Sequence, residues 1–250
     1  MKFPDSYYKY KDVNIQWVHV WGKFETGVFF HCAFFDVLLD GKKRTSIHTS
    51  LHTPEPQYYE TANGRYTWNL VQASFYTNTI RLNAEFSADY FKREGPNRIY
   101  RWNPNIKIVG KYFINGEWTD KLEAEGWVEE EHSSKNWAGI IYEKDGKPKV
   151  NNWTWVGIKL NDSRSIVVYN QENDHYCAIV DGNQVQEIKE YELINNELYL
   201  NDINMKVTLQ PIAITKRFNP MLGMAYSEQP MKVVIDGMQA GFAMREVTNG

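Results

Sequence analysis

The sequence predicts an all-β protein of two packed β-rich halves, built around a cavity lined with aromatic side chains. Trp, Tyr and Phe make up 15% of the residues, and aromatic and β-branched residues favour strands. Short runs of such residues recur about every ten positions between turn residues, and helical spacing is nearly absent. Many short strands at this spacing are typical of sandwiches and up-and-down barrels.

The expected strands follow one another along the whole chain. The first half has runs at 15–24, 28–39, 66–75, 79–86, 106–114 and 127–131. The second half has runs at 153–160, 165–170, 176–180, 184–191, 205–214 and 231–235. Hairpin-type turns are predicted between such runs at 25–27, 40–41, 115–116, 145–146, 181–182 and 236–237. The charged stretch 120–125 is compatible with one helical turn.

The polar stretch 135–152, which contains Asp145-Gly146-Lys147-Pro148, is the predicted junction between the halves. We therefore expect an N-terminal β domain at 1–140 and a C-terminal β domain at 141–250. A chain of 250 residues has enough material to bury a core in each.

Charge and composition argue against several classes of partner. A net charge of −3 and a pI near 6.1 give no general attraction to nucleic acid or anionic membranes. No apolar run approaches the length of a membrane span. The first residues lack the pattern of a secretory signal, and Cys32 and Cys177 are isolated, as in reduced proteins. We expect a cytoplasmic protein, unless a signal has been removed.

Six segments, in order along the chain, resemble the lipocalin-like family that contains carotenoid 1,2-hydratase (hydroxyneurosporene synthase) and the AttH-type proteins. QWVHVWGKF at 16–24 resembles the family's E-W-W-Y-x-x-G-x-L strand, and the strand at 29–35 follows it. GWVEEEHSS at 126–134 matches G-x-W-x-D-H-E-W-x-S, and WTWVGIKL at 153–160 resembles W-D-W-F-x-x-x-L. YSEQP at 226–230 and GFAMREVT at 241–248 resemble Y-x-E-G-P and G-x-G-x-x-E-x-T.

The resemblance implies two lipocalin-like β-barrel or β-sandwich domains and chemistry on apolar polyenes or terpenoids. Fungal decalin-forming pericyclases share this architecture, and one fold hosts several reactions. The family's cavity residues in D-H-E-W correspond to Glu130 and His132. The hydratase-type pattern also has a Tyr and an Asp downstream, which align with Trp155 and Gly157. No acid stands there, which argues against hydration.

The run Glu129-Glu130-Glu131-His132 carries the predicted catalytic groups. Alternation along a strand puts Trp127, Glu129 and Glu131 on one face and Val128, Glu130 and His132 on the other. In an apolar cavity Glu130 could stay protonated and protonate an alkene or hydrogen-bond to a carbonyl. His132 would orient it or act as a base. The alternative is a solvated acidic turn.

Aromatic residues are the predicted substrate-binding wall. Trp17, His19 and Trp21 share one face of the first expected strand. The later strands are predicted to add Trp127, Trp153 and Trp155 to the same kind of wall. Indole faces can fold a polyene and stabilise positive charge; the alternative is core packing. Tyr226 is a further catalytic candidate, whose phenol would reach a substrate oxygen or, alternatively, bond to backbone.

No metal or cofactor is expected. His48 and His52 would share a strand face but lie too far apart to ligate one ion easily, and no third ligand is evident. Metal-site spacings, a G-x-S-x-G elbow and phosphate-binding glycine loops are absent from the sequence.

The leading hypothesis is a cofactor-independent cyclase or isomerase, including a pericyclase, of natural-product biosynthesis. It would act on C=C bonds of an apolar polyene, terpenoid or polyketide by holding one reactive conformer, with Glu130, His132 or Tyr226 polarising the reacting group. Two alternatives remain. One is an alkene hydratase or dehydratase that uses Glu130 as acid, and the other is a non-catalytic carrier of a hydrophobic small molecule. The oligomeric state is left open.

Overall fold

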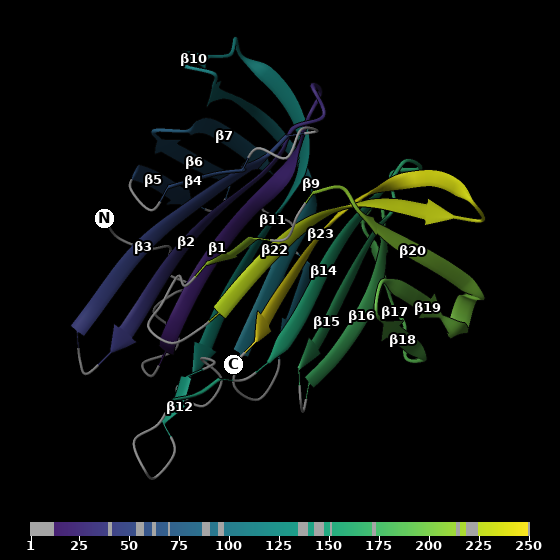
Figure 1. Cartoon of the computed structure of the whole chain (residues 1–250). Coiled ribbons are helices and arrows are strands. Elements are labelled where there is room, and N and C mark those ends of the chain that lie inside the picture. The colour runs from purple at the N-terminus through teal and green to yellow at the C-terminus, as the bar shows by residue number, and fades with distance from the viewer. Residues whose placement is uncertain are drawn as a thin grey trace. The chain divides into compact units, whose positions relative to one another are not determined.

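In the residues that it describes, the computed structural model consists of β-strands with one short 3-10 turn, η2 (Asn201–Ile203) (Figure 1). It describes residues 13–39, 42–53, 58–61, 64–69, 71–86, 91–94, 98–134, 140–142, 148–150, 152–171, 174–213, 216–218 and 225–249. Within these ranges no helix has the length and apolar character needed to span a membrane. The predicted all-β fold class is confirmed.

The chain divides into two compact units, unit 1 (Met1–Ala138) and unit 2 (Gly139–Gly250). In unit 1 an antiparallel sheet runs in the order β4-β3-β2-β1-β11-β9-β7-β6-β5, with β8 and β10 paired to β9. The strands are β1 (Val13–Phe24), β2 (Phe29–Leu39), β3 (Lys42–His52), β4 (Tyr58–Thr61), β5 (Gly64–Asn69), β6 (Gln72–Thr77), β7 (Ile80–Phe86), β8 (Phe91–Glu94), β9 (Arg98–Ile114), β10 (Glu117–Trp118) and β11 (Leu122–Ser134).

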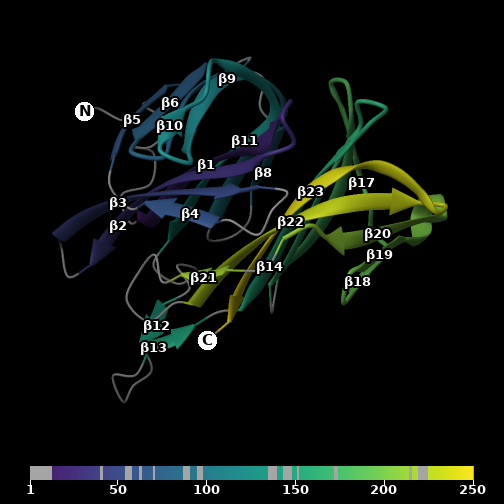
Figure 2. The ribbon, with the colours of Figure 1, turned by 45° about the horizontal axis from the view of Figure 1, so that its top comes forward.

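This sheet curls until strands from its two ends meet, as Figure 2 shows for β2, β3, β5 and β6. The rings of Phe34 on β2 and Tyr66 on β5 stack with centroids 3.9 Å apart. The hydroxyls of Thr49 on β3 and Thr77 on β6 lie 3.4 Å apart. Curling of this kind removes exposed strand edges and encloses one face of the sheet as a core.

The enclosed face holds the hydrophobic core of unit 1. Val18, Val20 and Phe24 of β1 contribute to it, together with Phe30 and Val128 from the neighbouring strands. Because side chains alternate along a strand, the intervening residues of β1 point to the opposite face of the sheet. That opposite face carries the candidate site described below.

Unit 2 repeats this design with a sheet in the order β17-β16-β15-β14-β23-β22-β20-β19-β18, and β21 pairs with β22. The strands are β14 (Trp153–Leu160), β15 (Ser165–Gln171), β16 (Asp174–Asp181), β17 (Gln184–Glu187), β18 (Tyr191–Ile194), β19 (Glu197–Leu200), β20 (Met205–Pro211), β21 (Lys216–Phe218), β22 (Ala225–Ile235) and β23 (Met238–Asn249). A separate hairpin joins β12 (Ile140–Tyr142) and β13 (Pro148–Val150).

The two ends of the unit 2 sheet are also held together. The Tyr191 hydroxyl on β18, at one end of the sheet, donates to Asn170 Oδ1 on β15, near the other end, at 2.7 Å. The core inside the curl includes Val156, Ile158 and other buried aliphatic side chains. Each unit therefore buries its own core.

Several predicted turns are confirmed by their backbone. Asn115-Gly116 and Asp236-Gly237 have positive φ at both residues, which is the geometry of tight hairpin turns. Gly27 and Gly182 also have positive φ. The predicted turns at 40–41 and 145–146 lie outside the described residues.

Four expectations about elements are wrong. The expected strand 184–191 is interrupted, because β17 ends at Glu187 and β18 begins only at Tyr191. Residues 120–125 form no helical turn, because β11 begins at Leu122 and pairs with both β1 and β9. The expected strand 66–75 is two strands, with a turn between β5 and β6. The expected strand 106–114 begins earlier, at Arg98, because β9 continues through Pro104. Proline is tolerated there since the register with β11 shifts between Gly126 and Val128, at a bulge.

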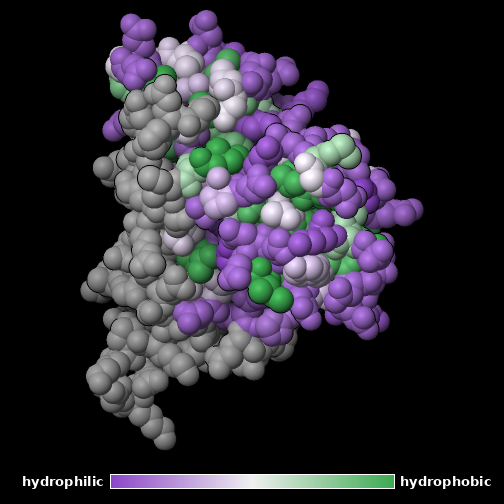
Figure 3. Space-filling model, turned by 45° about the vertical axis from the view of Figure 1, so that its right-hand side comes forward, coloured by the Kyte–Doolittle hydropathy of each residue, from purple (hydrophilic) through white to green (hydrophobic). Residues whose placement is uncertain are grey.

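The surface shown in Figure 3 is mostly hydrophilic, with hydrophobic residues scattered in small groups. The large hydrophobic side chains that are exposed among the described residues are likewise spread over several strands and turns; they are Val71, Tyr76, Val109, Val185, Ile194, Ile212 and Met238. Scattered apolar residues of this kind are ordinary on a protein surface.

The thiol of Cys177 is expected to be unreactive in the folded protein. Burial raises its pKa to about 12, whereas an unfolded thiol ionises near pH ~8.5. The unfolded state therefore loses its thiol proton first, and this group's contribution to stability falls as pH rises between these two values. Labelling with a thiol reagent near pH ~8 should occur only after denaturation. Rapid labelling of Cys177 under native conditions would contradict this expectation.

Candidate functional site

The candidate site lies on the face of the unit 1 sheet opposite its core, here called the Trp–His face. It is built on five neighbouring strands, β3-β2-β1-β11-β9. Every side chain on it that we discuss is buried. These are Trp17, His19 and Trp21 on β1, His31, Ala33 and Phe35 on β2, His48 and Ser50 on β3, Trp127, Glu129 and Glu131 on β11, and Tyr100 and Trp102 on β9.

Antiparallel register aligns these residues in rows across the strands. One row runs Trp102, Glu129, His19, Ala33, His48. The next row towards the turn between β1 and β2 runs Trp127, Trp21, His31, Ser50. Because directly opposed side chains lie close together, carboxyl, imidazole and aromatic groups become neighbours although they are far apart in the sequence.

Glu129 and Glu131 are the acids described on this face, and Glu129 is held by two groups. The Tyr100 hydroxyl donates a hydrogen bond to Glu129 Oε2 at 2.5 Å. His19 Nδ1 lies 3.2 Å from Glu129 Oε1, with both side chains almost completely buried. A carboxyl away from water is stabilised in its neutral form, whereas a protonated imidazole beside it favours the carboxylate. Glu129 and His19 thus form a buried carboxyl–imidazole pair, which becomes an ion pair when the imidazole is protonated.

Aromatic rings surround this pair. Trp17 lies beside His19 with ring centroids 6.2 Å apart. Trp21 and Trp127 stack at 6.0 Å with an interplanar angle of 23°, and Tyr100 stacks on Trp102 at 5.1 Å. Such faces carry negative quadrupole charge and attract cations. The acid therefore lies in surroundings that suit an apolar molecule carrying developing positive charge.

A second acid–base pair lies on the core face of the same strand. His132 Nε2 is 2.8 Å from Glu130 Oε1, and Arg101 donates to that same oxygen at 3.2 Å. Val18 is the residue of β1 opposite Glu130. Glu130 is 1% exposed, and its Oε2 atom accepts no hydrogen bond within the described part of the chain.

The structure thus separates residues that the sequence analysis combined in one site. Trp17, His19, Trp21 and Trp127 lie together on the Trp–His face, but Glu130 and His132 lie on the other face of the sheet. Glu129 belongs to the run that was predicted to carry catalytic groups but was not itself assigned a role, and it lies on the Trp–His face. Strand alternation already indicated that Glu129 shares a face with Trp127, and this was the signal in the sequence that pointed to Glu129.

The remaining predicted site residues belong to unit 2. Trp153 and Trp155 are buried on the non-core face of β14. Glu246 is opposite Trp155 on one side and Glu228 on the other, and both carboxyl groups are buried. Tyr226 lies in β22 opposite Thr248, and its side chain is outside the described residues.

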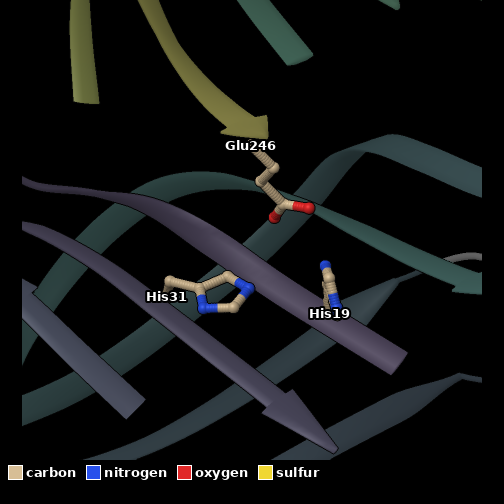
Figure 4. Close-up of side chains that lie close together, drawn as sticks. All are labelled: His19, His31 and Glu246. Atoms are coloured by element: carbon tan, nitrogen blue, oxygen red, sulfur yellow. The ribbon is translucent and has the colours of Figure 1, made fainter. Parts of the chain in front are cut away.

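His19 and His31 are the nearest approach to a metal site within unit 1. Figure 4 labels them on the adjacent strands β1 and β2. Their rings are perpendicular with centroids 4.8 Å apart, and one nitrogen of each lies within 4.8 Å of the other. Zinc sites use three or four protein ligands, so a metal ion would need further ligands beside these two imidazoles.

Comparison with known proteins identifies relatives of the fold. No protein-family model matches the sequence, and no curated protein sequence matches it. Among solved structures, a candidate AttH from Nitrosomonas europaea matches with a TM-score of 0.72 and 14% identity, covering 99% of this chain and 96% of that one. Kievitone hydratase from Nectria haematococca matches at 0.63 and 10% identity, covering 95% and 89%.

The structure of CghA with Sch210972 matches with a TM-score of 0.57 and 9% identity, covering 94% of this chain and 88% of that one. Identities this low establish a common fold and leave the reaction open. The matches extend over nearly the full length of each chain, and they agree with the observed architecture of two curled antiparallel sheets. The chain therefore has the lipocalin-like all-β fold of the AttH-type proteins.

Proposed function

We propose that the protein is a cofactor-independent enzyme of natural-product metabolism, a cyclase or isomerase that moves C=C bonds of an apolar polyene, terpenoid or polyketide. The observation that carries the proposal is the buried Glu129 carboxyl, which contacts Tyr100 and His19 on a face rich in tryptophan. Burying a carboxyl is costly unless it has a role or partners. Here the partners form a proton-transfer pair beside rings that would bind an apolar substrate.

In the proposed reaction the Glu129–His19 pair gives one proton to a carbon of the double bond, leaving a cation on the neighbouring carbon. The cation lies against the indole rings, which stabilise it. It then loses a proton from an adjacent carbon to the pair, which gives an isomer. For cyclisation, a second C=C of the same substrate attacks the cation before that proton is lost. Protons and electrons balance in both cases without a redox partner.

Tyr100 would act as a positioning residue. Its hydroxyl donates a hydrogen bond to Glu129 Oε2, and this holds the carboxyl in one orientation beside His19. Fixed donors of this kind need no reorganisation when charge develops in the reaction. Proton transfer by a positioned side chain accelerates reactions by about 10²- to 10⁴-fold.

Addition or removal of water is a second candidate reaction at the same pair. Kievitone hydratase, which by its name is a hydratase, shares the fold at a TM-score of 0.63. The first step would be the same protonation of the alkene, and water would then capture the cation. The Glu129–His19 pair would take up the proton that the water releases.

The proposal is tested by incubating the protein with polyene, terpenoid and polyketide extracts in deuterated water and following products by mass spectrometry. We expect isomeric products that carry one carbon-bound deuterium, because the transferred proton comes from a pair that exchanges with solvent. A parallel incubation in oxygen-18 water would label the product of hydration.

Two outcomes would contradict this proposal. A new isomer without deuterium would indicate a pericyclic rearrangement in which the protein only shapes its substrate. Ligands that bind and return unchanged would indicate a carrier.

A further inference from the structure

Ala33 is the centre of a ring of larger side chains on the Trp–His face. It stands directly opposite His19 on one side and His48 on the other. His31 and Phe35 precede and follow it by two positions on β2, and so share its face. Ala33 and these four neighbours are all buried.

The ring members contact one another. His19 lies 4.8 Å from His31 and 5.6 Å from Phe35, measured between ring centroids. Phe35 lies 5.5 Å from His48, edge to face. The small side chain of Ala33 therefore lies among three imidazoles and one phenyl ring.

Three imidazoles around a small residue suit an anionic oxygen group better than a metal ion. Each imidazole donates one N–H when neutral and two when protonated. Metal ions need donors about 2 Å from a common centre. Within the described residues His19 and His31 bring nitrogens within 4.8 Å of each other, and His48 does not join them at that spacing. A carboxylate has two oxygens and can accept from donors that are further apart.

We propose that this ring is a subsite for an acidic head group, a carboxylate or an ionised enol, on the substrate whose C=C bond reacts at Glu129. This inference rests on the proposed function, because it assigns a substrate class to the same face. The head group would lie over Ala33, and the apolar part of the molecule would extend over Trp17, Trp21 and Trp127. Along the row from β3 to β9, the imidazoles of His48 and His19 precede the carboxyl of Glu129. The β3 side of the row therefore carries imidazoles, whereas the acid is on β11.

The test compares a fluorescent conjugated polyene acid, cis-parinaric acid, with its methyl ester in equilibrium binding to the full-length protein. We expect the acid to bind about tenfold more tightly than the ester, which corresponds to one charge-assisted hydrogen bond. His48→Gln should lower the affinity for the acid by about that factor and leave the ester unchanged. His175→Gln, a change at an exposed histidine of unit 2, is the matched control and should alter neither.

Two further variants keep the proposal testable if His48→Gln folds poorly. Ala33→Ser keeps this side chain small and should preserve the preference for the acid. Ala33→Leu should weaken binding of the acid, because the larger side chain would occupy the proposed place of the head group. Equal binding of acid and ester by the wild type would overturn the subsite. That result would leave the proton-transfer proposal intact, since deuterium incorporation measures it separately.

Discussion

Replacing Glu129 with glutamine is expected to lower turnover by about a hundredfold or more, with a much smaller change in substrate affinity. Glutamine keeps the size of the side chain and still accepts a hydrogen bond from Tyr100, but it cannot hold an exchangeable acid proton. The aromatic rings that would bind the substrate remain in place. Rates of deuterium-labelled product formation, measured at several substrate concentrations, separate the effect on kcat from the effect on KM.

Two further variants identify which carboxyl acts. Glu125→Gln makes the same change on the same strand at an exposed position and should have little effect on the rate. Glu130→Gln makes the same change one residue further along the strand, on the core face. If Glu130→Gln lowered turnover more than Glu129→Gln, the acid would be the Glu130–His132 pair that the sequence first indicated, and the Trp–His face would lose its catalytic role.

Local patterns explain how much of the fold could be predicted. Short runs of aromatic and β-branched residues, together with the glycine turns at Gly116 and Gly237, identified many of the strands and the all-β class. The strand β3 was not among the expected runs, although a turn at 40–41 and a strand carrying His48 and His52 were considered, because residues 42–52 are mainly basic, hydroxyl-bearing or histidine. Its strand conformation comes from pairing with β2 rather than from its own propensity.

Predicting the site requires knowing how distant strands pair, and a single sequence does not give that pairing. Alternation predicted that Trp17, His19 and Trp21 share a face and that Trp127 and Glu129 share a face. Whether these two faces are the same depends on the register of β1 with β11. That register, with His19 opposite Glu129, determines which acid lies beside the tryptophans.

A pair of glycines allows β1 and β11 to come together at this point. Gly22 and Gly126 are directly opposite each other. A Cβ on Gly126 would lie 2.4 Å from the Trp21 carbonyl oxygen and 2.3 Å from Ile108 Cδ1. Real Cβ atoms essentially never approach other atoms so closely. Trp21 and Trp127, the neighbours of these glycines in the sequence, stack on the other face, so the close approach also sets the geometry of the aromatic wall.

Gly126→Ala is therefore expected to destabilise unit 1 by about 3 kcal/mol, at the upper end of the usual cost of overpacking a core. The strand β1 must move away from β11, because the clash with Trp21 is with backbone and a side-chain rotation cannot relieve it. The expected fall in the melting temperature of unit 1 is roughly 6–12 °C. The near-ultraviolet circular dichroism of the stacked indoles should weaken as well.

Gly116→Ala in the turn between β9 and β10 is the matched control for this change. No atom lies within 4 Å of its added Cβ, and the cost comes from the positive φ of 87° alone. That strain is worth about 1 kcal/mol, and it should leave the indole signal unchanged because the turn lies outside the Trp–His face. Equal melting temperatures for the two variants would show that the β1–β11 contact is more tolerant than its geometry implies. In that case the position of Trp21 against Trp127, and with it the aromatic wall beside Glu129, would not depend on the glycine pair.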